Sequence, residues 1–384
     1  MILSKKKRRF KASSPKSIMD KKIEWLCRRF GIEGEYQRYE VVTNGHINTT
    51  YKVYFYRDNE VKDYILQRIN TYVFKNPVEV MNNISSVTEY IRAKIKQGGI
   101  SAKRFVLHYY KNVEDGNYYI IGDQGGFWRL CRYIDNSITF NETDNLTLIE
   151  ETGKAFGNFQ LHLADYPVKS LHIAIPHFHN TVMRYENFKK SVEQNESGRA
   201  DEVSNDIEEY LKLEEIATQM YKMQKRGELP LKVTHNDTKC NNVLFDEDTF
   251  ENLAVIDLDT VMPGLVAFDF GDSIRFGANT CAEDERDTSK VKLDMAKYEA
   301  FAKGFMQTVG ATLTENEKET MALGAITMTV ECGLRFLTDY IDGDKYFKVE
   351  CSDHNLVRAR CQLALAKDMI EKYDEMKAIV KKYC

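Results

Sequence analysis

The chain has 384 residues, more than one hydrophobic core usually holds, because single cores stop growing near roughly 250 to 300 residues. Apolar residues at 43% and charged residues at 29% exclude a disordered chain, and the net charge of −4 excludes a general attraction to nucleic acid or to an anionic membrane. No unbroken apolar run approaches the roughly 18 residues that a membrane helix needs. We therefore expect two lobes in a cytoplasmic monomer or weak dimer, with eight reduced cysteines.

The first 20 residues carry a basic run at positions 5–11. Blocks of like charge repel one another and stay solvated, so we interpret residues 1–20 as a flexible leader outside the fold. A nucleic-acid-binding or lipid-binding arm is the alternative for this segment.

Residues 21–134 predict a small antiparallel sheet with a helix on it. A helix is expected near residues 19–30, and alternating β-branched and aromatic residues on both sides of Asn44-Gly45 predict a hairpin. Helical spacing of apolar residues predicts a helix over residues 79–96. Further strands are expected at residues 62–70, 104–110, 117–122 and 124–135, with 104–110 and 117–122 paired to each other.

Residues 135–384 are mainly helical by the same criteria. Pro167 and Gly227 end two of the expected helices, since proline and glycine interrupt helical periodicity. A short β island lies within this helical part, and the expected helices are 152–166, 205–227, 290–308, 314–341 and 354–382, with the island at 231–257. The fold class is therefore α+β, with a bilobal architecture and a ligand between the lobes.

The strongest chemical signal is the spacing His235-x-Asp237-x-x-x-x-Asn242. Phosphoryl transfer needs a carboxylate that accepts the proton of the attacking hydroxyl and oxygen ligands for Mg²⁺, and kinase catalytic loops have this spacing. Asp237 is the predicted base and Asn242 a metal ligand. Asp257, at the end of an apolar strand after a hairpin, is the predicted second metal ligand. The alternative is an Asx-rich turn that only joins strands.

Two segments carry a resemblance to a known family. Residues 235–242 read HNDTKCNN and residues 256–263 read IDLDTVMP, and the similarity extends to residues 271–285 and 334–348. The sequence resembles the aminoglycoside phosphotransferase and choline kinase branch of the protein-kinase-like fold, and within it the N-acetylhexosamine 1-kinases, over most of the chain from about residue 40. The resemblance implies ATP- and Mg²⁺-dependent phosphorylation of the anomeric hydroxyl of N-acetylglucosamine or N-acetylgalactosamine.

The nucleotide site is less explicit. Residues 42–53 stand in the place of a glycine-rich phosphate loop but have one glycine, Gly45, so backbone amides with Asn48 or Thr49 have to meet the phosphates. A plain hairpin turn explains this segment equally well. Residues 130–135 are expected to form the hinge, where the backbone around Arg132 and Tyr133 receives adenine.

Residues 64–70 lack the phosphate-binding lysine that kinases keep at this place. Gln67 and Arg68 are the substitutes, and their side chains point to opposite faces of a strand. The resemblance favours Arg68, because choline kinases have arginine there, with Gln67 as the alternative. Its acidic partner is either Glu79 or Glu89.

The resemblance places Thr260, Arg335 and Tyr346 around the sugar. Arg335 lies in an apolar run, where an unpaired arginine is costly, so it reaches either the ligand or a carboxylate such as Asp339 or Glu331. Tyr346 is alternatively an anchor for a lid. His179 and its neighbour His177 lie in a segment that resembles the family's second substrate loop, although surface histidines are common in such loops.

The run Asp269-Phe270-Gly271 looks like the metal-binding motif of protein kinases. Asp269 lies 27 residues after Asn242, however, whereas Asp257 lies 15 residues after it, as the motif requires. We therefore expect the metal to contact Asp257 and not Asp269. His235 and Asp269, or Asp272 beside it, are predicted to brace the catalytic loop, since carboxylates favour helix N-termini.

Two other functions remain open. A related small-molecule kinase acts on choline, an aminoglycoside or a plain hexose, but the last 100 residues mix both charge signs, which disfavours a polycationic substrate. A pseudokinase binding module is the second alternative. It is disfavoured because Asp237, Asn242 and Asp257 are all present.

Overall fold

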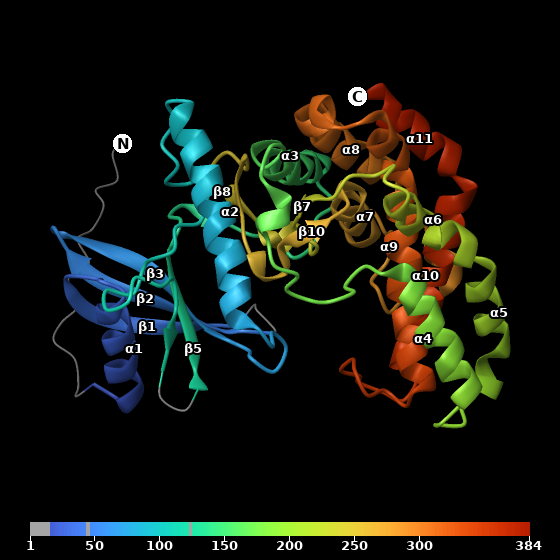
Figure 1. Ribbon diagram of the computed structural model, residues 1–384, viewed down its shortest axis with the longest axis horizontal. Helices are drawn as coiled ribbons and strands as arrows, with labels where there is room; N and C mark the ends of the chain where they lie inside the picture. Colours follow the sequence, from blue (N-terminus) through green and yellow to red (C-terminus); the bar gives the residue numbers. More distant parts are fainter. Residues whose placement is uncertain (1–15, 44–46, 123–124) are drawn as a thin grey trace. The chain divides into compact units, whose positions relative to one another are not determined.

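The computed structural model describes residues 16–43, 47–122 and 125–384. The chain divides into two compact units, which can be followed by colour in Figure 1. The first unit comprises the described residues up to Thr88 together with Leu107–Asp135, and the second comprises Glu89–Val106 and Asn136–Cys384. The basic run at 5–11 and the predicted hairpin residues Asn44 and Gly45 lie outside the described residues.

The first unit is built on a five-stranded antiparallel sheet in the order β1-β2-β3-β5-β4. The buried side chains of α1 pack on one face of this sheet, against Phe55, Leu66 and Leu130. The other face meets α2, where Arg129 of β5 contacts Met81. The elements are α1 (Ile18–Arg29), β1 (Glu35–Val42), β2 (Thr49–Arg57), β3 (Glu60–Ile69), α2 (Pro77–Gln97), β4 (Ile120–Ile121) and β5 (Phe127–Arg132).

The turn between β2 and β3 lies where the sequence predicts a break. Asp58 and Asn59 both have positive φ, at 54° and 64°. Short Asx side chains tolerate this conformation, and two such residues match the twist of a tight hairpin. The register of β2 against β3 follows, with Thr49 opposite Arg68.

The predicted strand at residues 104–110 is wrong. The Tyr110 N–H donates to the Leu130 carbonyl, and the Arg132 N–H donates to the His108 carbonyl. Tyr109 makes a single bridge to Cys131, so this segment only lines the edge of β5. β4 pairs with β5 instead of with this segment. The reason is visible in the burial pattern, since Val106 and Leu107 are buried in succession and break the alternation that a strand requires.

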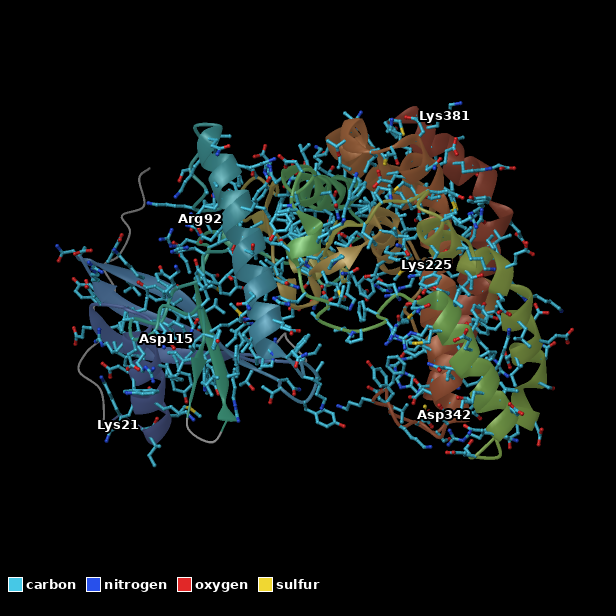
Figure 2. The ribbon with its side chains drawn as sticks, viewed as in Figure 1. Lys21, Arg92, Asp115, Lys225, Asp342 and Lys381 are labelled. Carbon is cyan, nitrogen blue, oxygen red and sulfur yellow. The ribbon has the colours of Figure 1, made fainter. Side chains whose placement is uncertain are left out.

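The second unit is helical and is organised around α9 (Glu315–Ile341), which packs against α4, α6, α7, α10 and α11. Its core is apolar, whereas Lys225 and Lys381 are exposed, and Lys381 is seen at the outer edge of α11 in Figure 2. The other α-helices are α3 (Leu146–His162), α4 (Thr181–Gln194), α5 (Ser204–Lys212), α6 (Glu214–Lys225), α7 (Val266–Gly277), α8 (Met295–Val309), α10 (His354–Glu371) and α11 (Tyr373–Lys382).

Several helix boundaries differ from the prediction. The expected helix at 205–227 is two helices that meet at Leu213, and the one at 354–382 is two that meet at Lys372. Leu213 and Lys372 both have φ near −90° and ψ near 0°. This conformation changes the direction of the chain, while the helical spacing of the apolar residues continues on both sides. Helix α4 was not expected, because residues 181–194 are dominated by polar side chains.

Glycines let α7 and α9 cross closely. A Cβ atom on Gly271 would lie 2.3 Å from the backbone oxygen of Gly324, and one on Gly324 would lie 2.1 Å from that of Ala267. Neither position has room for a side chain. This close crossing fixes α7, every residue of which from Val266 to Arg275 is buried.

Helix α9 is long and apolar enough to cross a membrane by length and composition alone, although its apolar residues do not form one unbroken run. In its most apolar 18-residue window, 89% of the residues are buried inside the protein. Since the neighbouring helices already cover this surface, α9 is explained as the core helix of the second unit.

Two small sheets lie within the second unit. β7 (Lys232–Thr234) pairs with β10 (Met262–Gly264), and β8 (Val243–Asp246) lies between β6 (Ser137–Ile138) and β9 (Asn252–Val255). The predicted island at 231–257 thus contributes to both sheets. The loop at 235–242 connects β7 to β8 and is held at both ends by strand pairing.

Candidate active site

Both carboxylate oxygens of Asp237 have partners on its own loop. The Lys239 ammonium lies 2.8 Å from Oδ1, and the Asn242 side-chain amide donates to Oδ2 at 3.0 Å and to the Asp237 backbone oxygen at 2.8 Å. The side chain keeps an exposed fraction of 30%. The carboxylate is therefore oriented and still reachable, as a base for a hydroxyl proton must be.

Backbone pairing brings Asn242 and Asp257 to the same end of β8 and β9. Val243 pairs with Val255, and the Ile256 backbone N–H donates to the Asn242 carbonyl at 2.9 Å. Asp257 follows directly, in the left-handed conformation with φ of 58°. A non-glycine residue in this conformation marks a constrained position.

These two residues fit a magnesium ion by their chemistry. The Asn242 amide uses its N–H groups on Asp237, which leaves its oxygen as the ligand atom, and Asp257 contributes a carboxylate. Among the described residues, no group of three or more His, Cys, Asp or Glu side chains is placed to hold a metal. A metal here would therefore depend on amide, carboxylate and phosphate oxygens together, as is usual for Mg²⁺.

Asp269 lies behind the loop and is completely buried. Its carboxylate accepts hydrogen bonds from the backbone N–H groups of His235 at 2.9 Å and Asn236 at 2.8 Å, and from the Gln160 amide at 2.7 Å. Burial raises the pKa of Asp269, against these donors and the nearby His235 ring, which lower it. All of its partners among the described residues are loop or core groups, which agrees with a brace rather than a metal ligand.

Asp272, one turn further along α7, takes part in the same support. It accepts from the Thr238 backbone N–H at 3.2 Å and pairs with Arg275 at 3.1 Å. Burial acts to raise the pKa of Asp272, but the Arg275 guanidinium and the Lys239 ammonium outweigh it and hold the pKa below its usual value. The alternative between Asp269 and Asp272 is resolved in favour of both contacting the loop.

His235 links the loop to the segment that carries Asp257. Its ring Nδ1 accepts from the Asp237 backbone N–H at 3.3 Å, so Nε2 carries the proton and donates to the Ile256 carbonyl at 2.8 Å. The ring packs edge-on against Phe156 and Phe159. This side chain therefore sets the spacing between the base and the predicted metal ligand.

Thr260 is tied to the same loop. Its hydroxyl donates to the His235 carbonyl at 2.6 Å, and its own carbonyl accepts from the Asn236 amide at 2.8 Å. A hydroxyl has one proton to donate and two lone pairs. The predicted sugar contact of Thr260 is thereby limited to accepting a hydrogen bond.

Arg335 makes neither of the ion pairs offered as alternatives. The carboxylate of Asp339 accepts the backbone N–H groups of Tyr346 and Phe347, at 2.8 and 2.9 Å. The Arg335 guanidinium lies over the rings of the same two residues, 5.8 Å from the centre of Tyr346 and 5.2 Å from that of Phe347. Figure 2 marks Asp342 at the end of α9, from which this segment continues.

His179 is held by a buried carboxylate. Its Nδ1 lies 2.9 Å from Glu331 Oε1, while the Thr181 hydroxyl donates to Glu331 Oε2 at 2.6 Å. His179 and His177 both line a cavity of about 240 Å³ that also borders Asn236 and Phe268. Glu331 was considered only as a partner for Arg335, and its pairing with His179 was not predicted.

The predicted nucleotide residues all belong to the first unit, apart from Gly45, which lies outside the described residues. The Asn48 side-chain oxygen accepts from the Asn70 backbone N–H at 2.9 Å, and Thr49 is exposed. The N–H groups of Arg132 and Tyr133 donate to the carbonyls of His108 and Asp63. The predicted contact of Arg132 and Tyr133 with adenine is therefore limited to their backbone carbonyl oxygens.

Gln67 and Arg68 point to opposite faces of β3, as the period of a strand requires. Gln67 lies on the face that meets α2, where its side-chain oxygen accepts from Arg129 Nε at 2.8 Å. Arg68 is exposed on the other face, and Glu79 forms no ion pair with it in the described part of the chain. Of the two candidates for the place of the phosphate-binding lysine, Gln67 and not Arg68 therefore lies beside α2.

Two residues were missed in the sequence. Arg129 is buried within the apolar strand FWRLCR, and an arginine in such a strand is itself a signal, because it must find partners. Lys239 lies inside the motif HNDTKCNN, two residues after the predicted base, and contacts it directly.

Residues 39–301 match the phosphotransferase enzyme family. A microcompartment-associated aminopropanol kinase is 14% identical with a TM-score of 0.59, covering 92% of this chain and 98% of that one. A choline kinase from Cryptosporidium parvum is 14% identical with a TM-score of 0.55, covering 94% and 99%.

A spectinomycin phosphotransferase, solved in complex with ADP and spectinomycin, is 12% identical with a TM-score of 0.53, covering 92% of this chain and 98% of that one. These likenesses confirm the predicted α+β, protein-kinase-like fold. Because the family match spans more than half of its length, the chain belongs to the phosphotransferase enzyme family.

Proposed function

We propose that this phosphotransferase transfers the γ-phosphate of ATP to the anomeric hydroxyl of an N-acetylhexosamine, giving a sugar 1-phosphate and ADP. The observation that carries the proposal is the Asp237 carboxylate, which is fixed by Lys239 and Asn242 on a loop braced by Asp269. The family match and the fold shared with an ADP-bound phosphotransferase support ATP as the donor.

In this proposal Asp237 orients the acceptor hydroxyl and takes its proton as the oxygen attacks the γ-phosphorus. The bond from phosphorus to the bridging oxygen breaks, and ADP leaves. Asn242 and Asp257 would hold Mg²⁺, which when bound neutralises charge on the phosphates. The side chains of this protein contribute position and charge, since phosphoryl transfer needs no covalent intermediate.

The acceptor is proposed from the charge around Arg335. A cationic acceptor such as an aminoalcohol is best bound by carboxylates or by the faces of aromatic rings. Here the rings of Tyr346 and Phe347 already face the Arg335 guanidinium, and the Asp339 carboxylate is engaged by their backbone. A neutral, oxygen-rich acceptor fits this surrounding better, and the resemblance to N-acetylhexosamine kinases gives its identity.

Another alcohol kinase is the second candidate function. The related structures are named for aminopropanol, choline and spectinomycin, so an aminoalcohol, an aminoglycoside or a plain hexose is the alternative acceptor. A pseudokinase is disfavoured by the intact arrangement of Asp237 and Asn242.

The test is an acceptor panel. The protein is incubated with MgATP and, separately, N-acetylglucosamine, N-acetylgalactosamine, glucose, choline and kanamycin, and ADP release is measured with Asp237→Asn as the control. We expect ADP release with the N-acetylhexosamines and at least a hundredfold loss in the variant, since a positioned base contributes about 10² to 10⁴. ADP release on choline or kanamycin alone contradicts the acceptor proposal, and equal release by the variant contradicts the site.

A further inference from the structure

Arg184 and Arg335 lie on two helices that a hydrogen bond joins. The Thr181 hydroxyl of α4 donates to Glu331 of α9 at 2.6 Å, and Arg184 and Arg335 each follow one turn later on their own helix. Only one hydrogen bond of the Arg184 guanidinium is found in the described part of the chain, from Nη2 to the Phe178 carbonyl at 3.1 Å. Its Nε is buried without a partner among the described residues. An arginine has five N–H groups, so most of the donors of Arg184 have no partner among the described residues.

The carboxylate that joins these two helices is already occupied. Glu331 attracts Arg184 electrostatically, but its two oxygens bind His179 and Thr181. Burial lowers the pKa of Arg184, Glu331 opposes that shift, and the like charge of Arg335 reinforces it. No carboxylate of the described residues forms an ion pair with Arg184 or Arg335.

Two guanidinium groups of like charge, with few partners among the described residues, favour a ligand that accepts their hydrogen bonds. The compensating group has to accept hydrogen bonds and be electron-rich, which describes a carbonyl or carboxylate oxygen. An ammonium group is excluded by the same charges. The two arginines thus discriminate between acceptors that carry a carbonyl or carboxylate oxygen and acceptors that carry an ammonium group.

Resting on the proposed function, we propose that Arg184 is a specificity-determining residue that, with Arg335, binds the acyl oxygen of the acceptor. The pair favours an N-acylated sugar over the same sugar with a free amine or with a hydroxyl. His179, fixed through Nδ1 by Glu331, lies beside this subsite on the segment that also supplies Phe178, the anchor of Arg184.

The experiment compares wild type and Arg184→Gln at saturating MgATP with N-acetylglucosamine, glucosamine and glucose. We expect KM for N-acetylglucosamine to rise about tenfold or more, because a charged hydrogen-bond donor is lost, with a smaller change in kcat. The ratio of kcat/KM for N-acetylglucosamine over glucose should fall by about the same factor, while the ratio for glucosamine over glucose should rise. Lys190→Gln, on the exposed face of α4, is the matched control.

A structural role for Arg184, through Phe178, predicts an equal loss on all three sugars. Unchanged ratios, or an equal loss on all three, overturn the inference. Arg184→Lys keeps the charge without the planar fork, so it should continue to reject glucosamine while recovering little of the preference for N-acetylglucosamine. Thermal unfolding tests whether Arg184→Gln folds. If it does not fold, Arg335→Gln is compared with wild type instead. A wild type that accepts glucosamine as well as N-acetylglucosamine overturns the inference.

The proposed function and this inference fail differently. Absence of turnover on every N-acetylhexosamine refutes the proposed function. The inference is then measured on the acceptors that are turned over, grouped by the presence of a carbonyl or carboxylate oxygen, and it fails if Arg184→Gln leaves their relative kcat/KM unchanged.

Discussion

Asp269 accepts a hydrogen bond from the backbone N–H of His235 at 2.9 Å, although the two residues are 34 positions apart in the sequence. The contact joins a buried helix, α7, to the loop that carries the predicted base. Because α7 is itself fixed against α9 by glycine contacts, the position of Asp237 depends on helix packing well away from it. A loop held in this way does not have to be ordered by its substrate.

Asp269→Asn should therefore destabilise the fold and slow turnover. An amide retains one acceptor oxygen and brings an N–H₂ group toward a backbone N–H, so at least one buried donor loses its partner, at a cost of about 1 to 3 kcal/mol. We expect the free energy of unfolding to fall by that amount and kcat to fall more than the acceptor KM rises. Denaturant unfolding and steady-state kinetics measure the two effects.

The control for this substitution is Asp374→Asn, at an exposed position of α11. Surface substitutions of this kind change stability by about 0.5 kcal/mol or less. An Asp269→Asn protein with the stability and kcat of the control would show that the two backbone contacts do not position the loop.

Glu331→Gln should remove a pH-dependent contribution to stability. Burial by itself raises the pKa of Glu331, but the His179 imidazole, the Thr181 hydroxyl and the Arg184 guanidinium outweigh it, so the pKa lies below its ordinary value of 4.5. A carboxyl whose pKa is lowered by folding stabilises the folded state above the unfolded pKa, and this contribution is lost as the pH falls through the folded pKa.

We therefore expect wild type to be more stable than Glu331→Gln near neutral pH and the difference to shrink as the pH falls below 4.5. Denaturant unfolding of both proteins at a series of pH values measures it. A difference that stays constant down to the acid limit, or grows there, contradicts the account of this carboxylate.

The contacts within the loop at 235–242 were predictable and those around His179 and Glu331 were not, for a physical reason. His235, Asp237 and Asn242 lie within eight residues, and Asp257 follows after one hairpin, so local spacing alone indicates their proximity. The contact of His179 with Glu331 joins residues 152 positions apart and depends on how α4 packs on α9. Sequence periodicity does not contain that information.

The choice between Gln67 and Arg68 shows a similar limit. Alternation along a strand puts the two side chains on opposite faces, but it does not tell which face a helix will cover. The structure places Gln67 toward α2, beside a buried arginine from the neighbouring strand. The segment at 104–110 was misassigned because its composition suits a strand while its burial does not alternate.

Thiol reactivity should separate the cysteines by burial. Burial raises the pKa of Cys131 to about 12 and those of Cys332 and Cys361 to about 11, so these thiols hold little reactive thiolate at pH 8. Cys351 is exposed. Alkylation of the native protein followed by peptide mass spectrometry should label Cys351 first, and alkylation of the denatured protein should label all eight. Rapid native labelling of Cys131 would show that this part of the core opens readily.

Tyr346→Ala should weaken the binding of the acceptor and leave the fold intact. The ring is 75% exposed, so its removal should change stability by about 0.5 kcal/mol or less. Loss of an aromatic contact worth about 0.5 to 1.5 kcal/mol should raise the acceptor KM by about 2- to 12-fold. Tyr72→Ala, at an aromatic residue of the first unit that is 82% exposed, is the matched control. Equal kinetics for the two variants would exclude Tyr346 from the acceptor site.

In the proposed function, Asp237 directs an anomeric hydroxyl to the γ-phosphate. Phosphorus NMR of a reaction containing the protein, MgATP and N-acetylglucosamine tests it most directly, with Asp237→Asn in parallel. The account predicts a new sugar 1-phosphate signal, equal in amount to the ADP formed, for wild type and none for the variant. A phosphate ester at another hydroxyl, or the same 1-phosphate signal from the variant, would contradict it.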